Sequence, residues 1–197
     1  MKKLFSSNKK FFLLIILIII TASANAYLII KLIQSNRPAP EVNTVSLALV
    51  PMSTIDPKIK NFGLKIKKLD ILVPVVKNVS GKDKAAYNDA LKDGVAHFEG
   101  TSLPGGKENI FIFGHSSAEI KSDYDKVFAK LNDLEKNDEI IILYEGKQYK
   151  YKIKNKDIVE ATDISVLEKG KKEVLTLMTC WPIGTKDKRL IIRAEPD

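Results

Sequence analysis

Residues 174–194 read VLTLMTCWPIGTKDKRLIIRA, in which two runs typical of β-strands flank a polar loop. The first run predicts a strand that ends at Cys180, and the second predicts a final strand that begins near Arg189. Because side chains alternate along a strand, Arg189 and Arg193 lie on one face of that final strand, and one of its two faces must turn inward. This stretch therefore contributes to the core and also carries a thiol and a guanidinium.

The rest of the sequence adds short strands and few helices. Strands are expected over 64–76, 109–113, 140–144 and 148–153, and helices over 84–92 and from Ser122 to a left-handed stop at Asn137. Pro74 limits the first of these strands to a sheet edge or a bulge. The fully apolar strand 109–113 ends at Gly114-His115. Many short strands with few helices indicate a mostly antiparallel barrel or sandwich.

The net charge of +8 is concentrated at the N-terminus. Residues 1–37 hold six of the 32 basic residues and no acidic one, whereas the other 26 basic residues are balanced by 24 acidic ones. A nucleic-acid-binding domain would carry its basic excess on the folded part of the chain. The charge distribution therefore gives no support to a nucleic-acid partner.

The N-terminal segment has the pattern of a membrane anchor. A basic tail covers 1–10, an apolar run covers 11–33, and a proline-containing stalk over 34–60 leads to a domain at 61–197. The apolar run can cross a hydrocarbon core of ~30 Å, and the preceding lysines predict a cytoplasmic N-terminus and an extracellular domain. The alternative is a signal peptide cleaved near the small residues at 24–26. On either interpretation the domain is exported.

Cys180 is the single cysteine of the sequence. It cannot form an intramolecular disulfide, so it is either a buried apolar side chain or a reactive thiol. Thiol catalysis needs a proton carrier and an oxyanion stabiliser. His115 shares with Cys180 a position at the end of an apolar strand, and Arg189 stays charged at any working pH. Arg193 is the alternative to Arg189, and His97 is interpreted as a structural histidine.

Two parts of this sequence resemble the sortase family of cysteine transpeptidases. One is Leu-Thr-Leu-Met-Thr-Cys at 175–180, followed nine residues after the cysteine by Arg189 and three apolar residues. The other is Gly114-His115 at the end of an apolar strand, preceded by FEGTSLPGG at 98–106. The order of His, Cys and Arg along the chain also fits, and the resemblance covers roughly residues 64–195.

The resemblance implies a closed eight-stranded β-barrel, antiparallel or mixed, with one or two short helices. It implies that Cys180 attacks the Thr carbonyl of a Leu-Pro-x-Thr-Gly-like sorting signal and that Arg189 stabilises the oxyanion. His115 would protonate the leaving amine and then accept a proton from the incoming one. Thr179 would line the groove for the sorting peptide. The implied partners are surface proteins with sorting signals and an amine acceptor, either a cell-wall precursor or a pilin lysine.

The subclass stays open at this point. Asp56-Pro57 is followed by Lys58 and not by the aromatic residue of a pilin-type lid, and the residues after His115 lack the arginine that often follows the catalytic histidine. No acidic cluster matches the calcium site of some housekeeping members, so no metal or cofactor is expected. The alternatives are another exported thiol enzyme that acts on cell-wall peptides, and a non-enzymatic anchored binding module.

Overall fold

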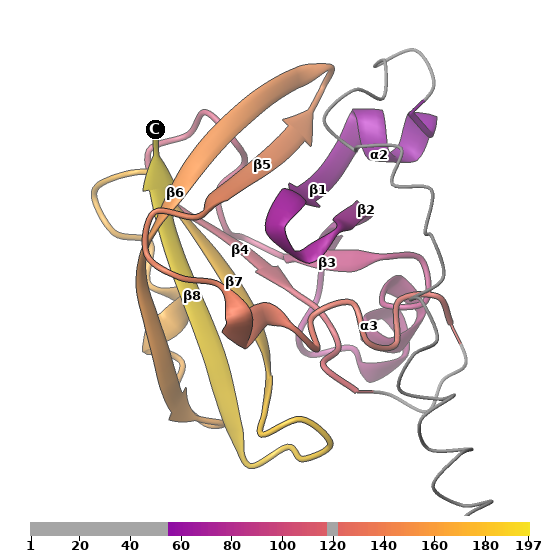
Figure 1. Cartoon of the computed structure of the whole chain (residues 1–197). Helices are drawn as coiled ribbons and strands as arrows, with labels where there is room; N and C mark the ends of the chain where they lie inside the picture. The colour runs from indigo at the N-terminus through magenta and orange to yellow at the C-terminus, as the bar shows by residue number, and fades with distance from the viewer. Residues whose placement is uncertain (1–54, 118–121) are drawn as a thin grey trace, which may run out of the picture. The chain divides into compact units, whose positions relative to one another are not determined.

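A computed structural model describes residues 55–117 and 122–197 of the chain (Figure 1). The predicted anchor, and the predicted stalk up to residue 54, lie outside these residues. In the part that the structure describes, no helix is long and apolar enough to cross a membrane.

Eight strands close into a barrel in the order β1–β2–β3–β4–β7–β8–β6–β5. They are β1 (Phe62–Ile66), β2 (Ile71–Val79), β3 (Val95–Phe98), β4 (Asn109–Phe113), β5 (Glu139–Tyr144), β6 (Lys147–Glu160), β7 (Val174–Trp181) and β8 (Lys188–Pro196). The pairs β2–β3 and β4–β7 are parallel and the other six are antiparallel. The implied eight-stranded mixed barrel is confirmed.

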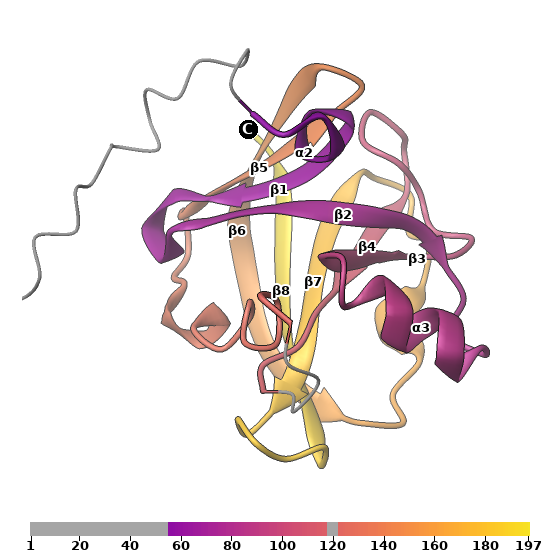
Figure 2. The same ribbon diagram turned by 90° about the vertical axis from the view of Figure 1, so that its right-hand side faces the viewer.

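Helices are short in the described residues. They are the α-helices α2 (Pro57–Asn61) and α3 (Lys84–Ala90) and the 3-10 helices η3 (Lys67–Leu69), η4 (Leu131–Asp133) and η5 (Ser165–Leu167). The predicted helix at 84–92 is thus present as α3. Its start is fixed by Asp83, whose carboxylate accepts hydrogen bonds from the backbone N–H groups of Ala85 and Ala86. Figure 2 shows α3 beside β3, on the outside of the barrel.

The predicted strand over 64–76 is in fact parts of two strands. Between β1 and β2 the chain turns through η3, and Asp70 adopts a left-handed conformation with φ of 57°. Pro74 lies inside β2, opposite Gly63 of β1, in a barrel that has no free edge. The pairing of β2 with β3 begins only at Val75, so the missing N–H of Pro74 interrupts none of it.

The predicted helix from Ser122 to Asn137 is wrong. The chain there forms turns and only the short η4, although Ser122 does donate a hydrogen bond to Asp125 and Asn137 is left-handed, with φ of 73°. The apolar residues that suggested a helix, including Phe128 and Leu131, are fully buried in the barrel core. Their tertiary contacts override the helical spacing, which identified the buried side chains correctly but not the backbone conformation.

Two apolar clusters hold the domain together. The interior of the barrel contains the alternate residues of β8, among them Leu190 and Ile192. A second cluster lies on the outer face, where Phe113 and Ile191 pack with Ala90 at the end of α3. Arg189 shares the outer face with Ile191, so its side chain belongs on the surface that α3 partly covers.

Candidate active site

The register of β7 against β8 places Cys180 directly opposite Arg189. In an antiparallel pair, opposed residues point to the same face with Cβ atoms about 4.5–5.5 Å apart. The two strands run side by side up to the loop that joins them (Figure 1). A thiol and a guanidinium that are nine residues apart in sequence are therefore neighbours in space.

The parallel pairing of β4 with β7 brings His115 to the same place. The ladder pairs Phe113 with Met178, and Gly114 continues it by donating its N–H to the carbonyl of Met178 at 3.1 Å. The next residue is His115, which lines one cleft together with Cys180. A Cβ added at Gly114 would come within 2.9 Å of a ring carbon of Phe128, so this close packing requires glycine.

The cleft has a volume of about 570 Å³, within the range of ligand sites. Its walls are Lys84, Tyr87, Asn88, His115, Ser117, Cys180, Gly184, Thr185, Lys186 and Arg189. The free thiol of Cys180 is partly exposed there. The three residues that the sequence put forward for catalysis thus meet in one solvent-accessible cavity.

His115 lies in surroundings that disfavour the protonated form of its imidazole. Burial lowers the pKa of His115, the carboxylate of Asp125 opposes the shift, and the ammonium of Lys186 adds to it. The Nε2 atom is buried and has no hydrogen-bond partner among the described residues. A buried, unpartnered ring nitrogen can accept a proton from a thiol or an amine that enters the cleft.

Arg189 is anchored by one of its two terminal nitrogens. Its Nη1 donates to the carbonyls of Lys186 and Lys188, at 3.0 and 2.9 Å. A guanidinium has five N–H donors, so the donors on Nη2 and Nε remain for a ligand. The loop between β7 and β8 therefore orients the guanidinium without using all its donors.

Arg193 is on the same face but in a different place. It lies opposite Thr176, and its Nη1 forms an ion pair of 3.0 Å with Asp157. It lines a separate cavity with Val166 and does not line the cleft of Cys180. Of the two candidate arginines, only Arg189 is beside the thiol.

The family model of the sortase domain matches residues 64–197. The chain belongs to the sortase family. Sortase D of Bacillus subtilis (strain 168) is 30% identical over 133 residues, which are 66% of this chain and 60% of that protein. Sortase SrtE1 of Streptomyces coelicolor is 28% identical over 142 residues, 66% of this chain and 38% of that protein. The chain thus spans less than two thirds of the length of these two relatives.

Solved sortase structures share the fold. Sortase C-1 from Actinomyces oris has a TM-score of 0.60 and 27% identity, with 73% of this chain and 76% of that chain covered. Sortase A from Corynebacterium diphtheriae has a TM-score of 0.58 and 27% identity, with 70% and 60% covered. The Clostridium perfringens sortase D5 transpeptidase has a TM-score of 0.57 and 25% identity, with 70% and 78% covered. These structures are of sortases named A, C and D, so the fold does not select a subclass.

His97 lies outside the cleft of this sortase. It is fully buried, its Nδ1 accepts from the N–H of Asn78 at 3.3 Å, and its Nε2 donates to the carbonyl of Ser102 at 2.9 Å. Burial lowers the pKa of His97. Each ring nitrogen thus has a hydrogen-bond partner, one as acceptor and one as donor, as expected of a structural histidine.

Thr179 is not where the sequence expectation put it. It is 2% exposed, is absent from the cleft walls, and donates its hydroxyl to the carbonyl of Gly114 at 2.8 Å. It faces the side of β7 opposite to Cys180, because neighbouring side chains alternate. This hydrogen bond links β7 to the residue before His115, which helps to keep the imidazole of His115 near the thiol of Cys180.

Helix α3 contributes cleft residues that the sequence did not reveal. Tyr87 stacks on Phe113 with ring centroids 4.9 Å apart and an interplanar angle of 11°. Burial raises the pKa of Tyr87, a negative charge on Cys180 adds to the rise, and Arg189 opposes it. The spacing of Tyr87 with Ala90 and Leu91 predicts a buried helix face, but no local signal indicates that this face meets the thiol.

A second, more apolar groove adjoins the cleft. It has a volume of about 500 Å³ and shares Lys84, Tyr87 and Arg189 with the cleft. Its other walls include Phe98, Phe111, Ile164, Val166 and Met178. The cleft and the groove thus adjoin each other on the outer face of β4, β7 and β8, and the two together are named the path.

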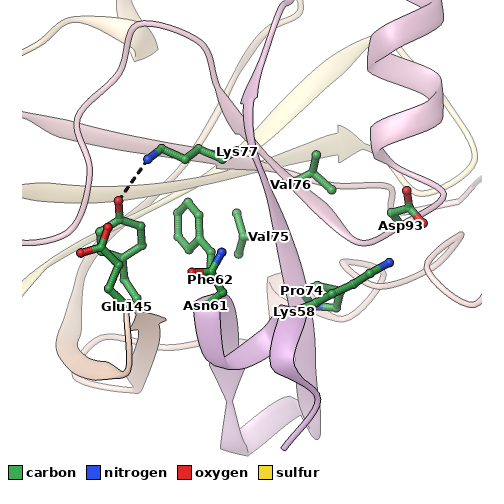
Figure 3. A pocket seen from close by; sticks show the side chains of 10 residues that line it. Lys58, Asn61, Phe62, Pro74, Val75, Val76, Lys77, Asp93 and Glu145 are labelled. Atoms are coloured by element: carbon green, nitrogen blue, oxygen red, sulfur yellow. Dashed lines mark hydrogen bonds between the residues drawn. The ribbon is translucent and has the colours of Figure 1, made fainter.

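Another cavity, of about 480 Å³, is drawn in Figure 3. It lies beside α2, β1 and β2, where Lys77 donates a hydrogen bond of 3.1 Å to the hydroxyl of Tyr144. It shares no wall residue with the cleft of Cys180. In the described part of the chain, no group of three or more His, Cys, Asp or Glu residues could hold a metal ion.

Proposed function

We propose that this sortase is an exported cysteine transpeptidase that cleaves a Leu-Pro-x-Thr-Gly-like sorting signal and joins it to an amine. One observation carries the proposal: Cys180 is opposed to Arg189 across β7 and β8 and shares one cleft with His115. A nucleophile, a proton carrier and a fixed cation within one cavity are the parts that acyl transfer requires. Membership of the sortase family supports the same reaction type.

In the acylation half, the thiol of Cys180 gives its proton to His115 and the thiolate attacks the Thr carbonyl carbon. The negative charge that develops on the carbonyl oxygen is stabilised by the free donors of Arg189. The C–N bond to Gly then breaks, and His115 returns its proton to the departing amine. The products are a thioester on Cys180 and a free peptide amine.

In the second half, an amine acceptor attacks the thioester carbon. His115 takes a proton from the attacking nitrogen, and Arg189 again stabilises the oxyanion. The C–S bond breaks, the thiolate of Cys180 is restored, and a new amide joins the substrate protein to its acceptor. The acceptor is a cell-wall precursor or a pilin lysine.

The apolar groove beside the cleft suits the residues that precede the scissile bond. With the Thr carbonyl at Cys180, the Leu-Pro part of the signal extends past Arg189 towards Phe111 and Val166. Burial of the leucine and proline side chains against such walls is favourable by about 25 cal/mol per Å² of apolar surface.

The extracellular site of this reaction agrees with the membrane anchor predicted over 11–33.

The test is amide formation. The full-length chain in detergent is incubated with a Leu-Pro-x-Thr-Gly peptide and a triglycine acceptor, and products are separated by chromatography. We expect the acyl part of the peptide linked to triglycine, with none formed by the Cys180→Ala variant. Hydrolysis that is insensitive to triglycine would indicate a hydrolase, and turnover by Cys180→Ala would overturn the proposal.

A further inference from the structure

We infer that Lys84 makes this sortase selective for sorting signals with an acidic side chain at the variable position, directly before the scissile threonine. The inference rests on the proposed function, because it assumes that a sorting peptide occupies the cleft and the adjoining groove. It concerns the variable position, the one residue of the signal whose side chain is specified neither by the apolar walls nor by the reacting groups.

Lys84 lies where the cleft and the groove meet. Lys84 is one of three residues that line both the cleft and the groove, with Tyr87 and Arg189. A peptide with its scissile carbonyl at Cys180 and an apolar side chain near Phe111 must pass this junction. The residue between those two anchors therefore passes closest to Lys84.

The path carries an excess of positive charge. Among the described residues, four basic side chains line the two cavities, Lys82, Lys84, Lys186 and Arg189, against the single carboxylate of Asp163. That carboxylate already accepts a hydrogen bond of 2.9 Å from the backbone N–H of Ser165. Beyond residue 37 the chain is nearly balanced, with 26 basic and 24 acidic residues. The positive excess is thus a property of this path, and it complements an acidic peptide.

Lys84 differs from the two other cations of the cleft. Arg189 donates hydrogen bonds to the carbonyls of Lys186 and Lys188, and its other donors are assigned to the reacting oxygen. Besides burial, the charge of Lys186 lowers the pKa of His115. Lys84 is exposed and forms no ion pair with any described residue, whereas Lys92 pairs with Asp89.

Its backbone is nevertheless fixed. Lys84 is the first residue of α3, directly after the capping residue Asp83. The carboxylate of Asp83 is engaged with the N–H groups of Ala85 and Ala86, at 2.9 and 3.1 Å. The ammonium of Lys84 is therefore an available charge on an anchored stem, as recognition of a side chain requires.

The size of the effect follows from the exposure of the pair. An exposed ion pair contributes up to about 1 kcal/mol, which is about fivefold in kcat/KM between Glu and the uncharged Gln at the variable position. With Lys at that position attraction becomes repulsion, and the preference for Glu over Lys rises to about tenfold or more. Because the pair is exposed, about 1 M salt, with a Debye length of about 3 Å, should reduce both preferences.

The experiment compares three peptides, Leu-Pro-x-Thr-Gly with Glu, Gln or Lys at x, on the full-length chain in detergent. Lys84→Gln should bring kcat/KM for the Glu and Gln peptides closer together, and Lys84→Glu should favour the Lys peptide over the Glu peptide. Lys67→Glu is the matched control, because it makes the same charge change on η3, at a residue that lines neither cavity. It should keep the wild-type order.

Equal kcat/KM for the three peptides would overturn the inference and leave the proposed function standing. So would an unchanged preference in both Lys84 variants, or the same reversal in Lys67→Glu. If the wild-type chain cleaves none of the peptides and gains no acyl group on Cys180, the proposed function fails and the inference falls with it.

Discussion

Replacement of the two arginines of β8 separates a catalytic from a structural role. Arg189 is directly opposite Cys180, whereas Arg193 is four residues further along β8, about 13 Å away at 3.3 Å per residue. Loss of one oxyanion donor lowers the rate by about 10²–10³, or about 2.7–4 kcal/mol. The Arg193–Asp157 ion pair is partly exposed, so its loss should affect stability by no more than about 1 kcal/mol.

We therefore expect kcat/KM to fall by about 10²–10³ in Arg189→Ala and by no more than a few-fold in Arg193→Ala. Arg189→Lys should recover little of the loss, because a single ammonium cannot reproduce the planar fork of donors. The assay is cleavage of a sorting peptide, with kcat and KM determined separately. A loss confined to kcat indicates an interaction made only in the transition state.

Arg189 also holds the β7–β8 loop through the carbonyls of Lys186 and Lys188, so each variant needs a thermal unfolding curve. A well-folded Arg189→Ala with poor turnover supports the assignment. The reasoning is refuted if Arg193→Ala loses more activity than Arg189→Ala while both remain folded.

Three further predictions concern His115, His97 and Gly114. The Lys186 ammonium lowers the pKa of His115, so Lys186→Gln should raise that pKa in an NMR titration of the imidazoles; a fall would contradict the proximity of the two groups. Burial lowers the pKa of His97 in the folded state, so the unfolded chain binds that proton more readily and the free energy of unfolding should decrease as pH falls below about 6.5. Urea unfolding at several pH values measures this, and His97→Gln should weaken the pH dependence of the free energy of unfolding. If that dependence is the same in His97→Gln, other groups cause it. Gly114→Ala should lower the free energy of unfolding by about 1–3 kcal/mol, because its Cβ overlaps a buried ring; a neutral effect in urea unfolding would contradict that packing.

Local patterns predicted most of the strands. The apolar run at 109–113 became β4 with the same bounds, and the alternating residues at 148–153 lie within β6, which continues to Glu160. Hydrophobic periodicity reports which side chains are buried, and in strands that is enough to infer the conformation. The closed eight-stranded barrel came from the family resemblance, and the order of its strands was not predicted, because strand pairing is a long-range property.

Some residues of the cleft were predictable from the sequence, but its geometry was not. His115, Cys180 and two candidate arginines were identified from the sequence, yet the register that opposes Cys180 to Arg189 depends on the length and path of the intervening loop. Nothing local identifies Tyr87 and Lys84 as cleft residues, because α3 reaches the thiol only through the packing of its buried face on the barrel. The helix predicted from 122 to 137 was wrong for the same reason. The apolar residues there pack into the barrel core in turns, although their spacing is helical.

Formation of a thioester between Cys180 and the sorting signal can be detected directly by intact-protein mass spectrometry. The full-length chain is mixed with a Leu-Pro-x-Thr-Gly peptide without an amine acceptor, quenched in acid and digested to locate any added mass. The thioacyl mechanism predicts an adduct equal to the acyl fragment through Thr, located on Cys180, absent from Cys180→Ala, and removed by triglycine with formation of the amide. Peptide cleavage without an adduct on Cys180, or an adduct that persists in Cys180→Ala, would contradict it.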